Sequence, residues 1–256
     1  MATRIRPGRP LAEELTRRAP ARGLPRIDKG GRRRIVKRVT VIVEGPTEER
    51  FVTDVLAPEL LPASVSLTPI VLGVPGHRGG RVNYARVRKD IVRYLKSDPT
   101  AYCTTLFDYY GLGAGFPSPP PNLTNSAKAT RIEAALKADI VAELDHLRAD
   151  QRFIPYLQVH EYEALLFSDP NALAAAIRIP NLTAQLTAIR RQFETPEDIN
   201  DDPHTAPSKR ILAHYPSYNK VIDGTIAAHN VSIQAMRREC PRFNTWLLSL
   251  ESLPDL

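Results

Sequence analysis

Five acidic side chains follow apolar runs at positions where strands are expected to end. Glu44 closes the run VTVIV and is followed by Gly-Pro and Glu48, Asp108 closes AYCTTLF, and Glu161 and Glu163 follow FIPYLQVH. In open α/β sheets, ligands bind outside the carboxyl ends of the strands. If the three strands are parallel neighbours, these carboxylates share one crevice, where their repulsion favours a hard cation such as Mg²⁺ or Mn²⁺.

A crowded carboxylate site suits the cleavage of phosphodiester bonds. A divalent cation neutralises the charge that develops on phosphate and activates water, and two cations about 4 Å apart clamp the attacking and leaving oxygens. We therefore expect Glu44, Glu48 and Asp108 to be catalytic and all five acids to be candidate metal ligands. Lys209, in TAPSKR, is a candidate cation for the scissile phosphate, with a helix-surface lysine as the plainer alternative.

Each acid also has a structural explanation, which for Glu44 is that any α/β protein can place an acid at a strand end. Glu48 suits the first turn of a helix, where a carboxylate interacts favourably with the helix dipole. Asp108 precedes Tyr-Tyr-Gly and is acceptable as a turn residue. Glu161 and Glu163 are two residues apart, so in an extended backbone both point the same way, toward a shared site or toward salt-bridge partners. His160 would then face the opposite side as a structural histidine.

The elements that must position these acids alternate between strand and helix. This alternation predicts an α/β fold with a parallel sheet of about four strands, joined by right-handed crossovers and flanked by helices. Pro69 lies in the second strand and favours an edge position for it. Hydrophobic periodicity predicts strands over 35–43, 66–74, 101–107 and 152–160, and helices over 47–61, 81–97 and 127–149.

Composition divides the 256-residue chain into three expected parts. Residues 1–34 are rich in Arg, Pro and Gly, a composition typical of disorder. Residues 35–170 carry the strand and helix alternation. Residues 171–256 contain only helical patterns, and we expect them to form a helical extension packed on the α/β domain, with Trp246 docking onto its core.

The positive charge is concentrated at the N-terminus. Thirteen Lys/Arg and three acids precede residue 39, a larger surplus than the whole-chain charge of +7, so the rest of the chain is mildly acidic. A basic arm suits binding to nucleic acid or another partner; an unselected leader is the alternative. No apolar run has the length of a membrane span or signal-peptide core, which predicts a cytoplasmic protein. Two cysteines argue against a disulfide framework or zinc site.

Three segments together resemble the Toprim domain of topoisomerases, primases and overcoming-lysogenization-defect (OLD) nucleases. They are VEGPTEE, LFDYYGL and HEYEALLFSD, at the first, third and fourth predicted strands, and the resemblance covers residues 37 to about 170. HEYEALLFSDP, together with EDINDDPHTAPSKRIL and CPRFNTWL, also resembles the bacterial family of domain of unknown function 4276. This second resemblance extends almost to the C-terminus.

The Toprim resemblance implies roles for individual residues. Toprim domains use a glutamate after the first strand as general acid or base, and an Asp-x-Asp pair after the third strand to hold magnesium. Glu44 and Asp108 match these positions, and Glu48 matches the second acid of nuclease-type members. The second aspartate is replaced by Tyr110, which weakens a topoisomerase or primase assignment and leaves the acids after the fourth strand to complete the ligand set.

The leading hypothesis is a Mg²⁺- or Mn²⁺-dependent nuclease acting on DNA or RNA. The resemblance implies bacterial anti-phage defence with an ABC-type or structural-maintenance-like ATPase encoded nearby. The loop PGHRGG lacks the Lys-Ser/Thr ending of a P-loop, so ATP dependence would come from that partner. Two alternatives stay open, a catalytically weak Toprim-like subunit of an ATPase complex and a phosphoryl-transfer enzyme for a small nucleotide. A homo-oligomer also stays open.

Overall fold

The computed structural model describes residues 35–73, 82–199 and 205–256. The chain separates into two units, Met1–Val36 and Lys37–Leu256, and all the described helices and strands belong to the second. The expected disorder and basic arm of residues 1–34 lie outside the described residues, as does the loop PGHRGG. Within the described ranges, no helix is both long and apolar enough to cross a membrane.

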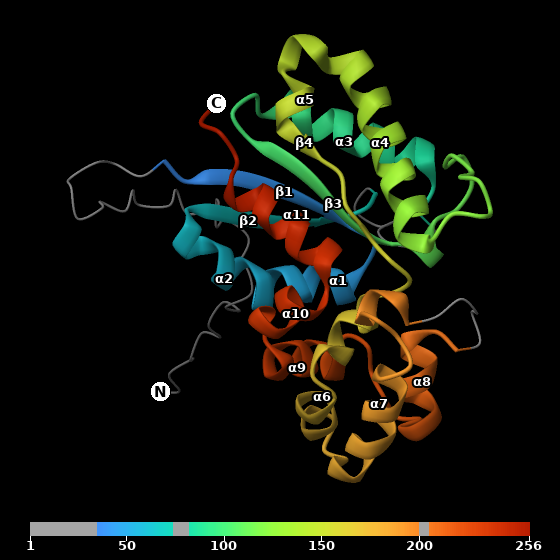
Figure 1. Cartoon of the computed structure of the whole chain (residues 1–256). Helices are drawn as coiled ribbons and strands as arrows, with labels where there is room; N and C mark the ends of the chain where they lie inside the picture. Colours follow the sequence, from blue (N-terminus) through green and yellow to red (C-terminus); the bar gives the residue numbers. More distant parts are fainter. Residues whose placement is uncertain (1–34, 74–81, 200–204) are drawn as a thin grey trace, which may run out of the picture. The chain divides into compact units, whose positions relative to one another are not determined.

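A parallel sheet forms the centre of the second unit, as the strand and helix alternation predicts (Figure 1). The strand order is β2-β1-β3-β4, and β5 also pairs with β3. Pro69 lies in β2, which is an edge strand as expected. The strands are β1 (Lys37–Val43), β2 (Val65–Val71), β3 (Tyr102–Asp108), β4 (Phe153–Ile154) and β5 (Leu157–Gln158).

The predicted fourth strand is two short strands. β4 pairs with Cys103–Thr104 and β5 pairs with Phe107–Asp108. Pro155 lies in the gap between them and has no N–H to donate. The Thr105 hydroxyl bridges this gap, because it donates to the Tyr156 carbonyl at 2.9 Å and accepts from the Tyr156 N–H at 2.9 Å. The chain therefore reaches the end of β3 still paired with it, and the residues after β5 emerge beside Asp108.

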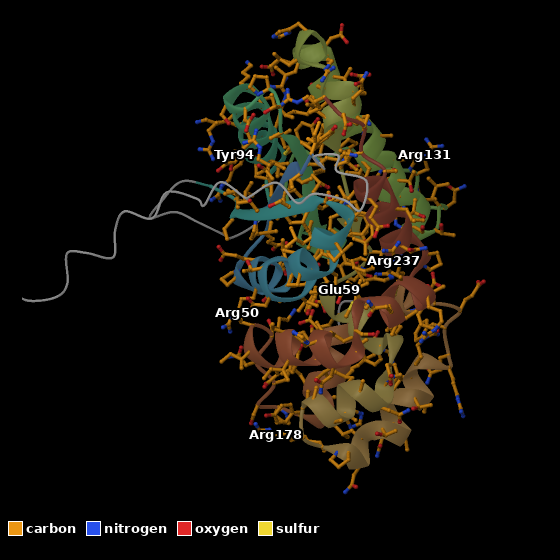
Figure 2. All side chains as sticks on the ribbon, turned by 90° about the vertical axis from the view of Figure 1, so that its left-hand side faces the viewer. Arg50, Glu59, Tyr94, Arg131, Arg178 and Arg237 are labelled. Atoms are coloured by element: carbon orange, nitrogen blue, oxygen red, sulfur yellow. The ribbon has the colours of Figure 1, made fainter. Side chains whose placement is uncertain are left out.

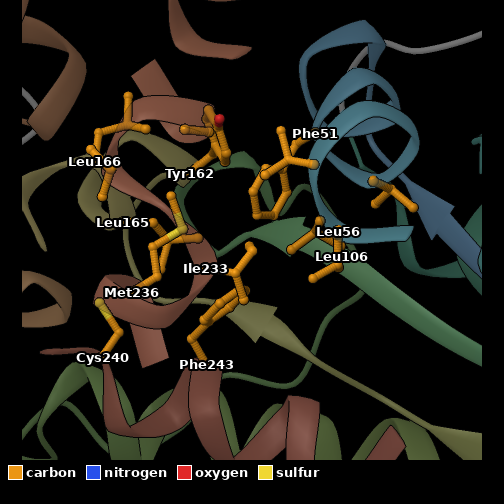
Figure 3. Close-up of a cluster of buried hydrophobic side chains, with 14 of the residues drawn as sticks. Phe51, Leu56, Leu106, Tyr162, Leu165, Leu166, Ile233, Met236, Cys240 and Phe243 are labelled. Carbon is orange, nitrogen blue, oxygen red and sulfur yellow. The ribbon is translucent and has the colours of Figure 1, made fainter. Parts of the chain in front are cut away.

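Alternate residues of β1 enter different hydrophobic clusters, as the strand pleat requires. Ile42 packs with side chains of α3 and α4, which cover one face of the sheet (Figure 1). Val41 and Val43 belong to the cluster on the opposite face, together with residues of the α1–α2 segment and of the C-terminal helices. Figure 3 shows part of this second cluster, where Phe51 meets Tyr162 with ring centroids 4.9 Å apart.

The helices differ from the predicted ones mainly where the backbone changes its winding. The first predicted helix consists of four successive pieces: α1, a π-helical stretch over Phe51–Leu56, α2 and a 3-10 turn. The third predicted helix ends after α4, and Arg148, at φ 55°, separates it from α5. The α-helices before the extension are α1 (Pro46–Arg50), α2 (Ala57–Leu60), α3 (Tyr84–Ser97), α4 (Asn125–Leu144) and α5 (Ala149–Arg152).

The C-terminal helices share the second cluster with the sheet. On their surface, Gln234 donates to Glu59 of α2 at 2.8 Å, and Arg237 forms a two-pronged ion pair with Glu251; Glu59 and Arg237 are labelled in Figure 2. The helices are α6 (Pro170–Ala176), α7 (Thr183–Arg190), α8 (Pro207–His214), α9 (Ile222–Val231), α10 (Ile233–Glu239) and α11 (Pro241–Glu251).

Trp246 of α11 docks on the sheet, as expected. Its ring stacks on Tyr156 with centroids 4.4 Å apart and an interplanar angle of 7°, and its indole N–H donates to the Thr104 hydroxyl at 2.9 Å. Glu197 caps the start of the same helix, because its carboxylate accepts from the backbone N–H groups of Arg242 and Phe243.

We expect Trp246→Ala to lower the free energy of unfolding by about 3–5 kcal/mol, the cost typical of a buried aromatic truncated to alanine. Urea denaturation followed by circular dichroism measures this change. Circular dichroism is used because the variant lacks the only tryptophan, so its unfolding cannot be followed by tryptophan fluorescence. Leu248→Ala, on the same helix but 50% exposed, is the matched control and should change stability by no more than about 0.5 kcal/mol. Equal effects of the two variants would contradict the docking role of Trp246.

Candidate functional site

The ends of β1 and β3 lie together at one edge of the sheet. The two strands are parallel neighbours with Val43 paired to Leu106, so Glu44, which follows β1, and Asp108, the last residue of β3, lie at the same edge. The Glu44 carboxylate accepts a hydrogen bond from the backbone N–H of Asp108. A Cβ atom on Gly111 would lie only 2.4 Å from Glu44 Oε2, so a glycine is needed there for the carboxylate to keep its place.

Glu48 has the helix-capping role considered for it and also lies close to Glu44. It is the third residue of α1, and its Oε2 accepts from the Gly45 N–H at 3.0 Å, as expected for an acid at a helix start. The residue is only 7% exposed. Burial first, and then the charge of Glu44, raise the pKa of Glu48 to about 7. Glu48 therefore caps the helix and also belongs to the same electrostatic site as Glu44.

The backbone after β5 is not extended, so the expectation that Glu161 and Glu163 alternate along a strand is wrong. His160 has a positive φ of 64°, and a 3-10 helix over Tyr162–Ser168 follows. The Tyr162 N–H donates to Asp108 Oδ1 at 2.9 Å, which fixes this turn against the end of β3. Both glutamates still reach the site from the turn.

The C-terminal helices contribute to the site in two places. The Ser208 N–H, in α8, donates to Glu161 Oε2 at 3.0 Å. The Lys220 ammonium, shortly before α9, lies 3.2 Å from Glu163 Oε1 and 3.6 Å from Glu161 Oε1. Lys209 is exposed at the start of α8, and its role toward a phosphate stays a prediction.

Sequence reasoning missed Lys220. The residue stands in the segment YNKVIDG, which has neither a motif nor a periodic apolar pattern, and 57 positions separate it from Glu163. Only the packing of α9 against the 3-10 helix brings it to the sheet edge. The Tyr162 hydroxyl donates to the Gly224 carbonyl at 3.0 Å in this contact, and a Cβ on Gly224 would lie 3.0 Å from the Tyr218 hydroxyl.

Glu44, Glu48, Asp108, Glu161 and Glu163 form one electrostatic unit, called the acidic cluster below. Burial and then the four glutamates of the cluster raise the pKa of Asp108 well above its ordinary value. Burial also raises the pKa of Glu44, and it raises that of Glu163 to about 7 although the Lys220 charge opposes it. The cluster resists carrying its full negative charge.

Lys220 supplies part of the missing positive charge. Burial alone would lower the pKa of this lysine, but the charges of Glu163, Glu161 and Asp108 outweigh burial, and the pKa is raised. Lys220 is therefore a stable ammonium ion at neutral pH. Among the described residues, the charge of Lys220 is outnumbered by the five carboxyl groups of the cluster.

The donor set fits a divalent cation, although it is not a finished metal centre. Across residues 35–73, 82–199 and 205–256, no three acidic, histidine or cysteine side chains converge closely enough to form a ready-made ion site. The available ligands are all carboxylate oxygens, the type that Mg²⁺ and Mn²⁺ prefer. Glu44 Oε2 is buried without a hydrogen-bond partner, a costly state that a bound cation or its water would relieve.

Comparison with known families identifies the chain. Residues 43–251 match the family described as Domain of unknown function (DUF4276). The chain belongs to this family. Among solved structures, this DUF4276 member is similar to the C-terminal region of the Burkholderia pseudomallei OLD protein, with 12% identity and a TM-score of 0.40, over 83% of this chain and 96% of that one.

A second similar structure is the C-terminal region of the Xanthomonas campestris pv. campestris OLD protein. It shares 15% identity and a TM-score of 0.36 with the DUF4276 member, over 84% of this chain and 94% of that one. Curated protein sequences give no match.

The raised pKa values predict the pH dependence of stability in the metal-free protein. Glu48 and Glu163 titrate at about 7 in the folded state, against an ordinary value of 4.5. Between these values the folded state holds protons that the unfolded state has lost, so stability falls as pH rises through this window. Glu48→Gln should flatten this fall by about 2 kcal/mol, since it removes one such group and keeps an oxygen for the Gly45 N–H.

Chemical denaturation between about pH 5 and pH 7, with a chelator present, measures this slope. Glu49→Gln is the matched control, because Glu49 is the adjacent carboxylate and lies on the same helix. It should keep the slope of the natural protein. A Glu48→Gln slope equal to that of the natural protein would show that Glu48 does not titrate in this window.

Proposed function

We propose that this DUF4276 member is a Mg²⁺- or Mn²⁺-dependent nuclease that cleaves phosphodiester bonds of nucleic acid. The observation that carries the proposal is the convergence of five carboxyl groups from three separate segments at the carboxyl edge of one parallel sheet. The raised pKa values of Glu44, Glu48, Asp108 and Glu163 support it, because perturbed carboxyl groups gathered in one place are typical of functional sites. The Toprim resemblance of the same segments assigns the same positions.

Glu48, Asp108, Glu161 and Glu163 would hold the cation. When bound, a divalent cation activates water and neutralises charge on the phosphate. Asp108 is the central candidate ligand, because it interacts with all four glutamates and the Tyr162 N–H holds its carboxylate in place. Glu161 and Glu163 are held by Ser208 and Lys220, which would orient them toward the ion.

Glu44 would move the proton. Its Oε2 has no hydrogen-bond partner, and it is kept in place by Gly111 and the Asp108 N–H. Burial raises the pKa of Glu44 toward neutral pH, which improves a carboxylate as a general base for the attacking water. The Lys220 ammonium would limit the repulsion between the acidic cluster and the substrate phosphate, and Lys209 is the second candidate for a contact with the phosphate.

The cellular setting follows from the resemblance to OLD nucleases. It supports a role in bacterial anti-phage defence, in the cytoplasm, with an ABC-type or structural-maintenance-like ATPase as partner. The basic segment that precedes residue 39 would add attraction for the phosphate backbone of DNA or RNA.

A catalytically weak binding subunit of an ATPase complex is the second candidate function. The observation that favours it is Tyr110, which stands where the Toprim pattern has its second aspartate. In that case the acidic cluster would bind an ion or a partner without turning over a substrate.

The first test is cleavage of supercoiled plasmid, single-stranded DNA and total RNA by the full chain with Mg²⁺ or Mn²⁺. Glu44→Gln should reduce metal-dependent cleavage by about 100-fold or more, the usual contribution of a general base. Comparing Lys209→Ala with Lys220→Ala identifies which lysine serves the phosphate. Metal-dependent cleavage that survives in Glu44→Gln would refute the assigned role, and no cleavage at all would favour the binding subunit.

Metal binding is tested separately from activity by titration calorimetry with Mg²⁺. Asp108→Asn should weaken binding by at least about tenfold, the loss typical of removing even an outer-shell partner. Asp145→Asn is the control, since Asp145 is exposed on the turn after α4. Equal Mg²⁺ affinity in both variants would place the ion elsewhere.

A further inference from the structure

Two pockets open beside Tyr109 and Tyr110, the two residues that follow the end of β3. One has a volume of about 420 Å³ and is bounded by the loop over 112–119; the other has a volume of about 590 Å³ and is bounded by residues 121–125. Tyr109, Tyr110 and Lys128 line both of them. These volumes lie in the range of about 300–1,000 Å³ that is usual for small-ligand sites.

The shared wall is an aromatic platform. Tyr110 is 36% exposed, and its backbone N–H donates to the His160 carbonyl at 3.4 Å. The Tyr110 ring centroid lies 5.1 Å from the buried His160 ring and 6.0 Å from the Tyr109 ring. The ring is thus supported by the folded core and still presents surface to both pockets.

The platform is joined directly to the acidic cluster. Tyr109 and Tyr110 are the two residues between Asp108, which belongs to the cluster, and Gly111, which packs against the Glu44 carboxylate. A nucleic acid strand with one phosphate at the cluster would therefore have an adjoining base within the neighbourhood of Tyr110. The Lys128 side chain completes the wall with a positive charge suited to a neighbouring phosphate.

We propose that the Tyr109–Tyr110 platform and Lys128 form a binding site for an unpaired nucleobase and its phosphate, so that the substrate is single-stranded nucleic acid. Stacking on an aromatic ring uses the face of a base, which is covered by its neighbours in a duplex. Lys128 holds the backbone beside it. The proposal rests on the proposed function for its choice of nucleic acid as ligand, and it explains why a tyrosine stands where the Toprim pattern has an acid.

The test is equilibrium binding of fluorescent oligonucleotides to the full chain in the presence of a chelator, so that no cleavage takes place. Three probes of equal length are compared: a single strand, the same strand with abasic sites, and the duplex. The natural protein should bind the base-bearing single strand about 5-fold or more tightly than either other probe, the effect expected for one stacked base. Equal affinity for the three probes would overturn the proposal.

Variants assign the effect to the platform. Tyr110→Ala should remove the preference for bases over abasic sites, and Tyr110→Phe should keep it. Lys128→Ala should weaken the base-bearing and abasic strands equally and reduce the salt dependence of binding. Lys137→Ala, on the same helix and similarly half-buried, is the control and should leave binding unchanged. A base preference that survives in Tyr110→Ala would refute the site.

A competition assay with a nucleoside monophosphate distinguishes the polymer from a small nucleotide. If the nucleoside monophosphate displaces the single strand only at concentrations far above the dissociation constant of the single strand, the result supports a polymer as ligand. Displacement at comparable concentrations overturns the single-strand assignment. Failure of this proposal and failure of the proposed function can be distinguished. A Tyr110-dependent base preference without cleavage would support the binding site and refute the nuclease. Cleavage without that preference would support the nuclease and refute the binding site.

Discussion

Repulsion among carboxyl groups at the carboxyl edge of the sheet constrains the rest of the fold. The parallel pairing of β1 and β3 brings Glu44 and Asp108 together, and the turn after β5 adds Glu161 and Glu163. Carboxyl groups that are close together and shielded from water cannot all stay ionised without compensation. The protein compensates with backbone N–H donors, with raised pKa values and with one lysine.

These compensating groups come from segments that lie far apart in the sequence of the second unit. The Gly45 N–H serves Glu48, the Tyr162 N–H serves Asp108, and the Ser208 N–H serves Glu161. The residues from 171 onward are therefore more than a cover for one face of the sheet. Their helices share a hydrophobic cluster with β1, and they carry the two groups that hold the acids of the 3-10 turn.

The fold class and the positions of the acids could be predicted because they depend on local patterns. Apolar β-branched runs define β1 and β3, and an acid at the end of each is visible in the sequence. The break at Pro155 and the 3-10 turn could not be predicted in the same way, because Thr105 and Asp108 hold those segments by contacts between distant residues.

The position of Lys220 could not be predicted from the sequence for the same reason. Its place depends on α9, a helix with a glycine at 224 that fits closely under Tyr218 and beside Tyr162. Glycine lowers helix propensity, so a local analysis passes over this segment. The packing that makes the glycine favourable exists only after the C-terminal helices have docked.

The late position of Lys220 in the sequence also determines when the site can assemble during synthesis. A ribosome releases Glu44 and Asp108 well before Ser208 and Lys220, so a nascent chain carries the acids without their partners. The acidic edge can reach its finished geometry only when synthesis has passed residue 220 and α9 has docked. Translation itself thus delays the maturation of the site, and a truncated product would retain the acids in an unfinished arrangement.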